Sequence, residues 1–267
     1  MGYLKLFIIG VVQGITELLP VSSSGHILIF GKLFTWDIPS SMLVLFHLGT
    51  TLAILIFFWK KIFKGFLTKK KWNFYLKILV ATIPAALMGF FFNDFIEKEL
   101  RAVWIIGISL IVWGIVMIVL EKFKKESKED VKDIEKITWK QAIVTGLAQA
   151  IALIPGTSRS GITTIAGVLS GLDKYTALEF SFILSIPVLF GSFAWLVLKG
   201  GLNNLGIIET VTGLNSLPFS LGIMFLTTFV FGILSLFLLK KIQRKNWLTI
   251  FGIYRIVIGI ALLIIFY

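Results

Sequence analysis

The stretch "GLAQAIALIPGTSRSG" (Gly146–Gly161) repeats the pattern of "GVVQGITELLPVSSSG" (Gly10–Gly25), which lies 136 positions earlier. The glutamine and the final glycine have the same separation in both copies, while the proline moves by one place. Each copy is followed by three long apolar segments. An internal repeat on this scale predicts a chain made of two structurally related halves.

The composition is that of a membrane protein. Of the 267 residues, 57% are hydrophobic and 15% are charged, and the mean hydropathy is +0.94. Soluble domains carry about 25% charged residues, and a helix needs about 20 apolar residues to cross a bilayer. We therefore predict an all-α polytopic membrane protein with complete spans at about 41–59, 74–93, 102–120, 177–198, 218–239 and 247–267.

The repeated regions themselves are too short or too polar to span. Their apolar runs resemble re-entrant segments of roughly 10–14 residues, whose backbone is tolerated at membrane depth only where protein or a wet cavity covers it. We expect re-entrant helical hairpins at about 3–34 and 141–172. One integrated membrane domain would then comprise a first repeat (1–120), a charged cytoplasmic linker (121–140) and a second repeat (141–267).

Counting the crossings predicts the topology. A hairpin returns the chain to its starting side and three spans move it across, so the second repeat should be inverted relative to the first, as in many transporters. Lysines concentrate on one predicted side, at 60–77, 121–140 and 240–245. The positive-inside rule places that side in the cytoplasm and both termini outside. The two signature loops then enter from opposite faces and meet in the middle.

Charge and cysteine content restrict the classes of function. There is no cysteine, which excludes disulfides, thiolate metal sites and a cysteine nucleophile. The net charge of +12 is explained by loops that face anionic membrane lipids, so we expect no nucleic-acid partner. The oligomeric state is not evident from the sequence, and a homodimer is compatible with it.

Arg159 is a permanent charge in an apolar region, among glycines and hydroxyls. One interpretation is a structural arginine that pairs with backbone carbonyls. However, helix N-termini offer free N–H groups, and a guanidinium grips phosphate oxygens in a fork. Phosphate binding is therefore the better interpretation, with donors from Gly156, Thr157, Ser158 and Ser160.

The first copy carries a different set of polar groups. Glu17 lies four residues after Gln13, so both project from one helical face. The pair could be structural, catalytic or metal-binding, and magnesium often binds through one or two carboxylates plus substrate phosphates. His26 lies three residues after Ser23, within reach on a helix, so either residue is a candidate nucleophile. Ser22 is a further candidate for contacting phosphate.

Three other polar residues are weaker candidates. His47 is expected to be a packing and hydrogen-bonding residue, and Glu179 is interpreted as structural. Arg255 lies within the last span and needs a partner, for which Glu179 or a helix end is suitable.

Together, "QGITELLPVSSSGH" and "PGTSRSGITT" identify a family. The chain resembles the undecaprenyl-diphosphate phosphatases, the bacitracin-resistance type of bacterial membrane phosphatase, and the likeness extends to "FHLGTTLAIL" and "YRIVIGI". The resemblance implies hydrolysis of undecaprenyl diphosphate to the monophosphate at the bacterial plasma membrane, on the extracytoplasmic side. It also implies a divalent cation, Mg²⁺ or Ca²⁺, and recycling of the lipid carrier for peptidoglycan. The matching family positions are Gln13, Glu17, Ser23, His26, Ser158, Arg159 and Thr163.

Two other functions compete with this one. A transporter or flippase of an anionic polyprenyl lipid would use the same inverted plan and the same binding chemistry. The Ser/His/Glu set, present only in the first copy, favours an enzyme. An intramembrane serine protease would leave Arg159 unexplained.

Overall fold

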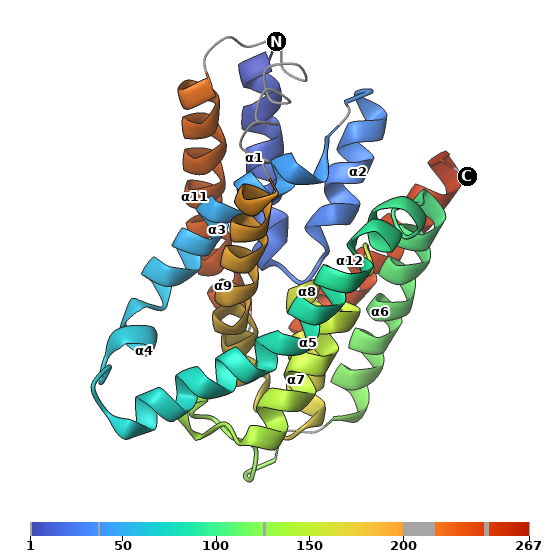
Figure 1. Ribbon diagram of the computed structural model, residues 1–267. Helices are drawn as coiled ribbons and strands as arrows, with labels where there is room; N and C mark the ends of the chain where they lie inside the picture. The colour runs from blue at the N-terminus through green and yellow to red at the C-terminus, as the bar shows by residue number, and fades with distance from the viewer. Residues whose placement is uncertain (1, 37, 125–126, 200–216, 243–245, 267) are drawn as a thin grey trace.

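The computed structural model describes residues 2–36, 38–124, 127–199, 217–242 and 246–266 (Figure 1). Eleven α-helices and one 3₁₀ helix lie within these residues. Their bounds are α1 (Gly2–Leu18), α2 (Ser23–Leu33), α3 (Ser40–Phe57), α4 (Trp59–Phe63), α5 (Lys69–Glu99), α6 (Val103–Phe123), η1 (Ile134–Lys136), α7 (Trp139–Ile151), α8 (Arg159–Leu169), α9 (Lys174–Leu198), α11 (Leu217–Ile242) and α12 (Trp247–Phe266).

The prediction of a multi-pass helical membrane protein is confirmed. Five helices, α5, α6, α9, α11 and α12, are long and apolar enough to cross a bilayer. In the most apolar stretch of each of these helices, at most a third of the residues are buried inside the protein. Large apolar side chains such as Phe91 and Val112 are exposed. Exposed apolar surface of this extent needs lipid to cover it.

The remaining expected span, at 41–59, is shorter than predicted. Helix α3 ends at Phe57, and the chain continues as the separate short helix α4 from Trp59. The break falls where the apolar run meets Lys60 and Lys61, which favour the polar edge of a membrane over its interior.

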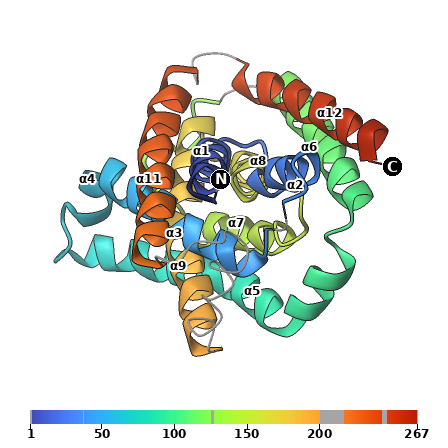
Figure 2. The same cartoon turned by 90° about the horizontal axis from the view of Figure 1, so that it is seen from above.

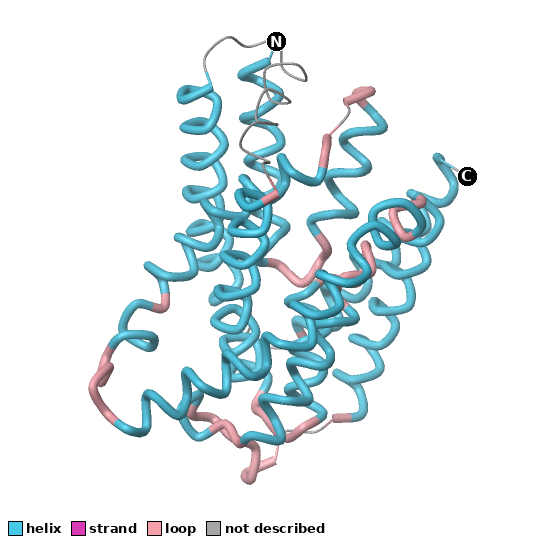
Figure 3. Tube along the Cα trace, in the orientation of Figure 1, coloured by secondary structure: helices cyan, strands magenta, loops and turns pink. Residues whose placement is uncertain are grey.

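The hairpins α1–α2 and α7–α8 lie in the centre of the bundle, with the longer helices around them (Figure 2). Helices α1 and α2 extend toward the end where the chain starts, whereas α7 begins at the opposite end, beside the loop that follows α6 (Figure 1). The loops that break both hairpins lie at mid-height (Figure 3). The first helix of each hairpin packs on a long helix of the other half, α1 on α11 and α7 on α5.

The two hairpins turn in the same unusual way. Ser22 (φ 71°, ψ 97°) precedes α2, and Ser158 (φ 67°, ψ 108°) precedes α8. These serines are 136 positions apart, as are Gln13 and Gln149. Positive φ is uncommon for a residue other than glycine, so finding it at both places makes the turn geometry a shared feature of the two copies.

Glycines allow α6 and α12 to pack closely. A Cβ atom on Gly114 would lie 2.7 Å from the carbonyl oxygen of Gly252, and one on Gly259 would lie 2.8 Å from that of Gly107. The backbones therefore approach to a distance that a side chain would prevent, which is typical of helix pairs in membranes. This contact fixes α12, which carries Arg255.

The linker (121–140) packs against the rest of the protein and is not freely solvated. Ile134 and Ile137 are buried, and the Val131 N–H donates to the Gly171 carbonyl at 3.0 Å. Hydrogen bonds from Lys70 and Lys71 hold the pKa of the Glu135 carboxyl below its usual range. The sequence predicted only a solvated connection because its buried residues are two single isoleucines among charges.

The α6–α12 contact predicts a sharp difference between two glycine substitutions. In Gly114→Ala the new methyl meets backbone that cannot move aside, and we expect a loss of about 1–3 kcal/mol of stability. Gly89→Ala is the matched control, because nothing lies within 4 Å of its Cβ position. Thermal unfolding in detergent measures both. Equal melting temperatures for the two variants would contradict the close packing.

Candidate active site

The two hairpin loops touch each other in the centre of the protein. The Gly156 N–H donates to Ser24 Oγ at 3.3 Å, and Ser160 Oγ donates to the Leu19 carbonyl at 3.4 Å. Ser24 and Ser160 occupy equal positions in the two copies. The expectation that both signature loops meet is therefore confirmed.

Arg255, on α12, forms hydrogen bonds to both loops. Its side chain is fully buried, and its guanidinium donates to the carbonyls of Pro20 (3.2 Å), Gly156 (2.8 Å) and Thr157 (2.9 Å). These carbonyls belong to turns where helical bonding has ended. The guanidinium thus satisfies acceptors of residues that are buried inside the bundle.

Glu17, at the end of α1, lies at the centre of a polar cluster. Its Oε1 accepts a hydrogen bond and ion pair from Arg159, and its Oε2 accepts from Ser23 Oγ at 2.6 Å and from Gln13 Nε2 at 3.2 Å. His47 Nε2 lies 3.3 Å from the same Oε2. The structure brings four residues from both hairpins and α3 onto one carboxylate.

The second hairpin carries buried polar atoms that have no partner among the described residues. They are Arg159 Nη1, Thr157 Oγ1 and both amide atoms of Gln149. An unpaired buried polar group costs about 1–3 kcal/mol. Such atoms are therefore expected where water or a ligand supplies the missing bonds. Gln149 was not predicted as a site residue, although its match with Gln13 in the repeat could have indicated it.

Other predicted phosphate-binding residues lie in or beside the turns but are already bonded. Ser158 Oγ caps α8 by accepting from the Gly161 N–H at 3.3 Å, which confirms that a helix begins at Arg159. Thr163 Oγ1 donates to the Arg159 carbonyl at 2.6 Å and lies 2.5 Å from Ser181 Oγ. Ser22 Oγ lies 3.1 Å from Ser24 Oγ.

His26 does not contact Ser23. Its Nδ1 lies 2.8 Å from the Ser22 carbonyl, and its Nε2 lies 2.6 Å from Tyr254 Oη on α12. The expected serine–histidine pair is therefore not formed, because the first turn of α2 directs Ser23 to Glu17 and His26 to α12. Tyr254 was not predicted, and only its position before Arg255 could have drawn attention to it.

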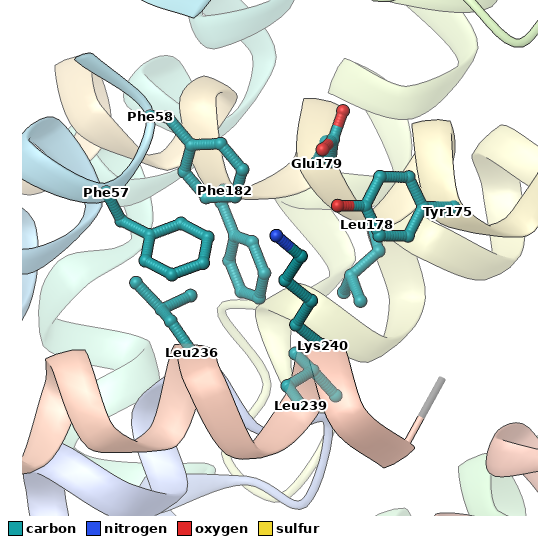
Figure 4. Close-up of a pocket in the computed structure, with 9 residues that line it drawn as sticks. All are labelled: Phe57, Phe58, Tyr175, Leu178, Glu179, Phe182, Leu236, Leu239 and Lys240. Carbon is teal, nitrogen blue, oxygen red and sulfur yellow. The ribbon is translucent and has the colours of Figure 1, made fainter. Parts of the chain in front are cut away.

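His47 is a hydrogen-bonding residue, as predicted, and its partner is Glu17. Of the two partners expected for Arg255, Glu179 is wrong, because Glu179 pairs with Lys61, whose Nζ donates to Oε1 at 2.6 Å. Arg255 binds carbonyls of the turns instead. Figure 4 shows Glu179 at a small cavity where the ends of Tyr175 and Lys240 point toward each other. The interpretation of Glu179 as structural fits this ion pair, which joins α9 to α4.

The donor set allows a metal ion only in part. Within the described ranges, no group of three or more His, Asp or Glu side chains could hold a metal ion. Glu17, the Gln13 amide and Ser23 offer oxygens, which Mg²⁺ and Ca²⁺ prefer. Because the single carboxylate already binds Arg159, further oxygens from a substrate are needed to complete a site.

Comparison with known proteins identifies the family. Residues 6–261 match the family model described as bacitracin resistance protein BacA. The chain belongs to this family. It is 40% identical to undecaprenyl-diphosphatase 1 of Clostridioides difficile (strain 630) over 273 residues, which cover 98% of this chain and 96% of that protein. It is 40% identical to the undecaprenyl-diphosphatase of Thermosipho melanesiensis over 259 residues, with 95% of each covered, and 34% identical to that of Enterococcus faecalis over 274 residues, with 98% and 96% covered. The family resemblance stated from the motifs is confirmed.

The role of Arg255 can be tested by a substitution that keeps its charge. In Arg255→Lys one ammonium group cannot reach the carbonyls of both loops, and we expect about 1–3 kcal/mol less stability for each acceptor left unpaired. The melting temperature in detergent should fall by several degrees. Arg101→Lys, at an exposed i,i+4 pair with Glu97, is the matched control. An unchanged melting temperature for Arg255→Lys would show that the loops do not depend on it.

Proposed function

We propose that this protein hydrolyses undecaprenyl diphosphate to undecaprenyl phosphate, which recycles the lipid carrier for cell-wall synthesis. The observation that carries the proposal is the meeting of Ser23 and Arg159 on the two oxygens of Glu17. This arrangement places a nucleophile, a proton acceptor and a phosphate-binding cation together. Relatives that align over nearly the full chain are named undecaprenyl-diphosphatases, which supports the same substrate.

Ser23 is the nucleophile that the geometry favours. Its hydroxyl already donates to Glu17 Oε2. As Ser23 Oγ bonds to the terminal phosphorus, its proton passes to Glu17 and the bond to the leaving undecaprenyl phosphate breaks. Water then attacks the phosphoserine and releases inorganic phosphate, and the Glu17 proton is returned. Attack by water alone remains the second route, with Glu17 as its base.

His26 is a poorer nucleophile in this arrangement. A backbone carbonyl only accepts hydrogen bonds, so Nδ1 of His26 carries a proton toward the Ser22 carbonyl. Its other nitrogen faces Tyr254. Neither nitrogen is directed at Glu17 or Ser23.

Arg159 binds the phosphate in this proposal. Its Nη1 is buried without a partner among the described residues, while Nη2 contacts Glu17. A diphosphate carries more negative charge than one carboxylate and can draw the guanidinium toward its oxygens. Glu17 Oε2, to which Ser23 already donates, accepts the serine proton. Thr157 and the first N–H groups of α8 offer further donors to the phosphate.

We further propose that a divalent cation, Mg²⁺ or Ca²⁺, binds with the substrate. Glu17 and the Gln13 amide oxygen are the side chains that would hold it, and the diphosphate would complete its shell. Such an ion, when bound, neutralises charge on the transferring phosphoryl group.

The topology that we propose is a pair of inverted repeats in the bacterial plasma membrane. The support is the equal turn geometry at Ser22 and Ser158, and the approach of the two hairpins from opposite ends (Figure 1). Lysines of α4 and the start of α5 lie at the end opposite α1, so the positive-inside rule puts both termini outside. The names of the relatives do not favour the alternative of a transporter.

Release of phosphate tests the function directly. We expect the purified protein in detergent to release inorganic phosphate from undecaprenyl diphosphate with Mg²⁺ or Ca²⁺, and to lose this activity in EDTA. Ser23→Ala should lower kcat at least about a thousandfold, as loss of a nucleophile does. Ser192→Ala is the control, since its hydroxyl donates to the Val188 carbonyl on the exposed part of α9. A fully active Ser23→Ala variant would exclude Ser23 as the nucleophile.

Arg159→Lys tests the phosphate contact. Lysine keeps the charge but loses the fork that can bind Glu17 and phosphate together. We expect at least about a hundredfold loss of kcat/KM, since arginines in phosphoryl transfer contribute about 10³–10⁵. Expression level and melting temperature show whether the variant inserts and folds normally. Near-normal turnover in Arg159→Lys would make Arg159 structural.

A further inference from the structure

Tyr254 and His26 form a hydrogen bond beside the proposed site. Tyr254 Oη lies 2.6 Å from His26 Nε2, and the two ring planes are within 4° of parallel. His26 is 7% exposed, whereas Tyr254 is 41% exposed on α12. The phenol therefore turns its hydroxyl inward to a buried imidazole while its ring stays at the surface.

The other side of the imidazole fixes its protonation. Nδ1 faces the Ser22 carbonyl at 2.8 Å, and a carbonyl cannot donate, so the proton of the neutral ring lies on Nδ1. Nε2 is then an acceptor, and Tyr254 Oη is its donor. By donating to Nε2, the tyrosine hydroxyl supports the tautomer that the Ser22 carbonyl requires, and it holds the ring in place against that carbonyl.

The Ser22 carbonyl belongs to the turn that presents Ser23. Ser22 has the positive φ of 71°, and no side-chain hydrogen bond caps α2 at this residue. The His26 imidazole contacts this turn by donating a hydrogen bond to the Ser22 carbonyl. The next residue, Ser23, directs its hydroxyl to Glu17 at 2.6 Å. A continuous path of hydrogen bonds therefore connects α12 to the strained turn, from Tyr254 through His26 to Ser22.

We propose that Tyr254 is a positioning residue of the phosphatase reaction. It acts through His26, which it holds in the Nδ1–H tautomer so that the Ser22 turn keeps Ser23 directed at Glu17. This inference rests on the proposed function, in which Ser23 attacks the phosphate. Its neighbour Arg255 holds the same region by the Pro20 carbonyl, so two consecutive residues of α12 set the geometry of the first loop.

Kinetics of Tyr254→Phe test the proposal. The change removes only the hydroxyl, and the half-exposed ring keeps its packing. We expect kcat to fall about 10–100-fold, the range seen when a partner that orients a functional histidine is removed. KM should change little because Arg159 is untouched. Tyr75→Phe is the matched control, since it removes a similar hydroxyl bond to the Ile62 carbonyl away from the site. A Tyr254→Phe variant with wild-type kcat would overturn the proposal.

A double-mutant cycle separates positioning from general stabilisation. If Tyr254 acts through His26, Tyr254→Phe should cost nothing further in a His26→Gln background. Independent, multiplicative losses would contradict the path through the histidine.

Nitrogen NMR of ¹⁵N-histidine protein gives a readout that does not need activity. The chain has two histidines, so the His26 signals are those that His26→Gln removes. We expect a protonated Nδ1 and a bare Nε2 in the wild type, and a mixture of tautomers in Tyr254→Phe. An unchanged spectrum would refute the role of Tyr254. If the wild type released no phosphate, the proposed function would fail, while these spectra would still decide whether Tyr254 sets the tautomer.

Discussion

A chain that ends helices inside a helical bundle must find partners for the backbone groups that helical bonding no longer satisfies. This protein does so twice, at the turns before α2 and α8, and it uses one buried guanidinium for both. Arg255 binds carbonyls of the first and second turn together. The close glycine packing of α6 and α12 fixes the helix that carries it. The position of the polar cluster therefore depends on how a lipid-facing pair of helices packs.

The same turn serves two different chemical purposes. The residue that follows the positive-φ serine is Ser23 in the first copy and Arg159 in the second, and each is the first residue of its helix. One supplies a hydroxyl and the other a guanidinium. Because the turns face each other, both side chains reach Glu17. A repeat with equal backbone geometry has thus produced an unequal pair of groups, as expected for a site where one group attacks and the other binds charge.

The ion pair of Glu17 and Arg159 also explains why a charge is tolerated here. Each buried charge is costly alone, and removing one partner of such a pair typically costs about 3–5 kcal/mol. Arg159 keeps one nitrogen without a partner among the described residues, and Thr157 and Gln149 of the same hairpin are in the same condition. The same guanidinium therefore neutralises the carboxylate and keeps a nitrogen that can bind an anion.

The sequence by itself determined the class of fold and most members of the site. The lengths of the apolar runs predicted the helices, because a bilayer demands such lengths, and the repeated motif predicted two loops that meet. Glu17, Ser23, Gln13 and Arg159 were identified because ionisable and polar groups are rare in apolar segments. Which of them touch was decided only by the tertiary structure. Partners such as His47 for Glu17, or the loop carbonyls for Arg255, lie 30 to 235 positions apart along the chain. No local pattern encodes such distances. The angle at which two helices cross sets these contacts, and it depends on side chains of the whole bundle.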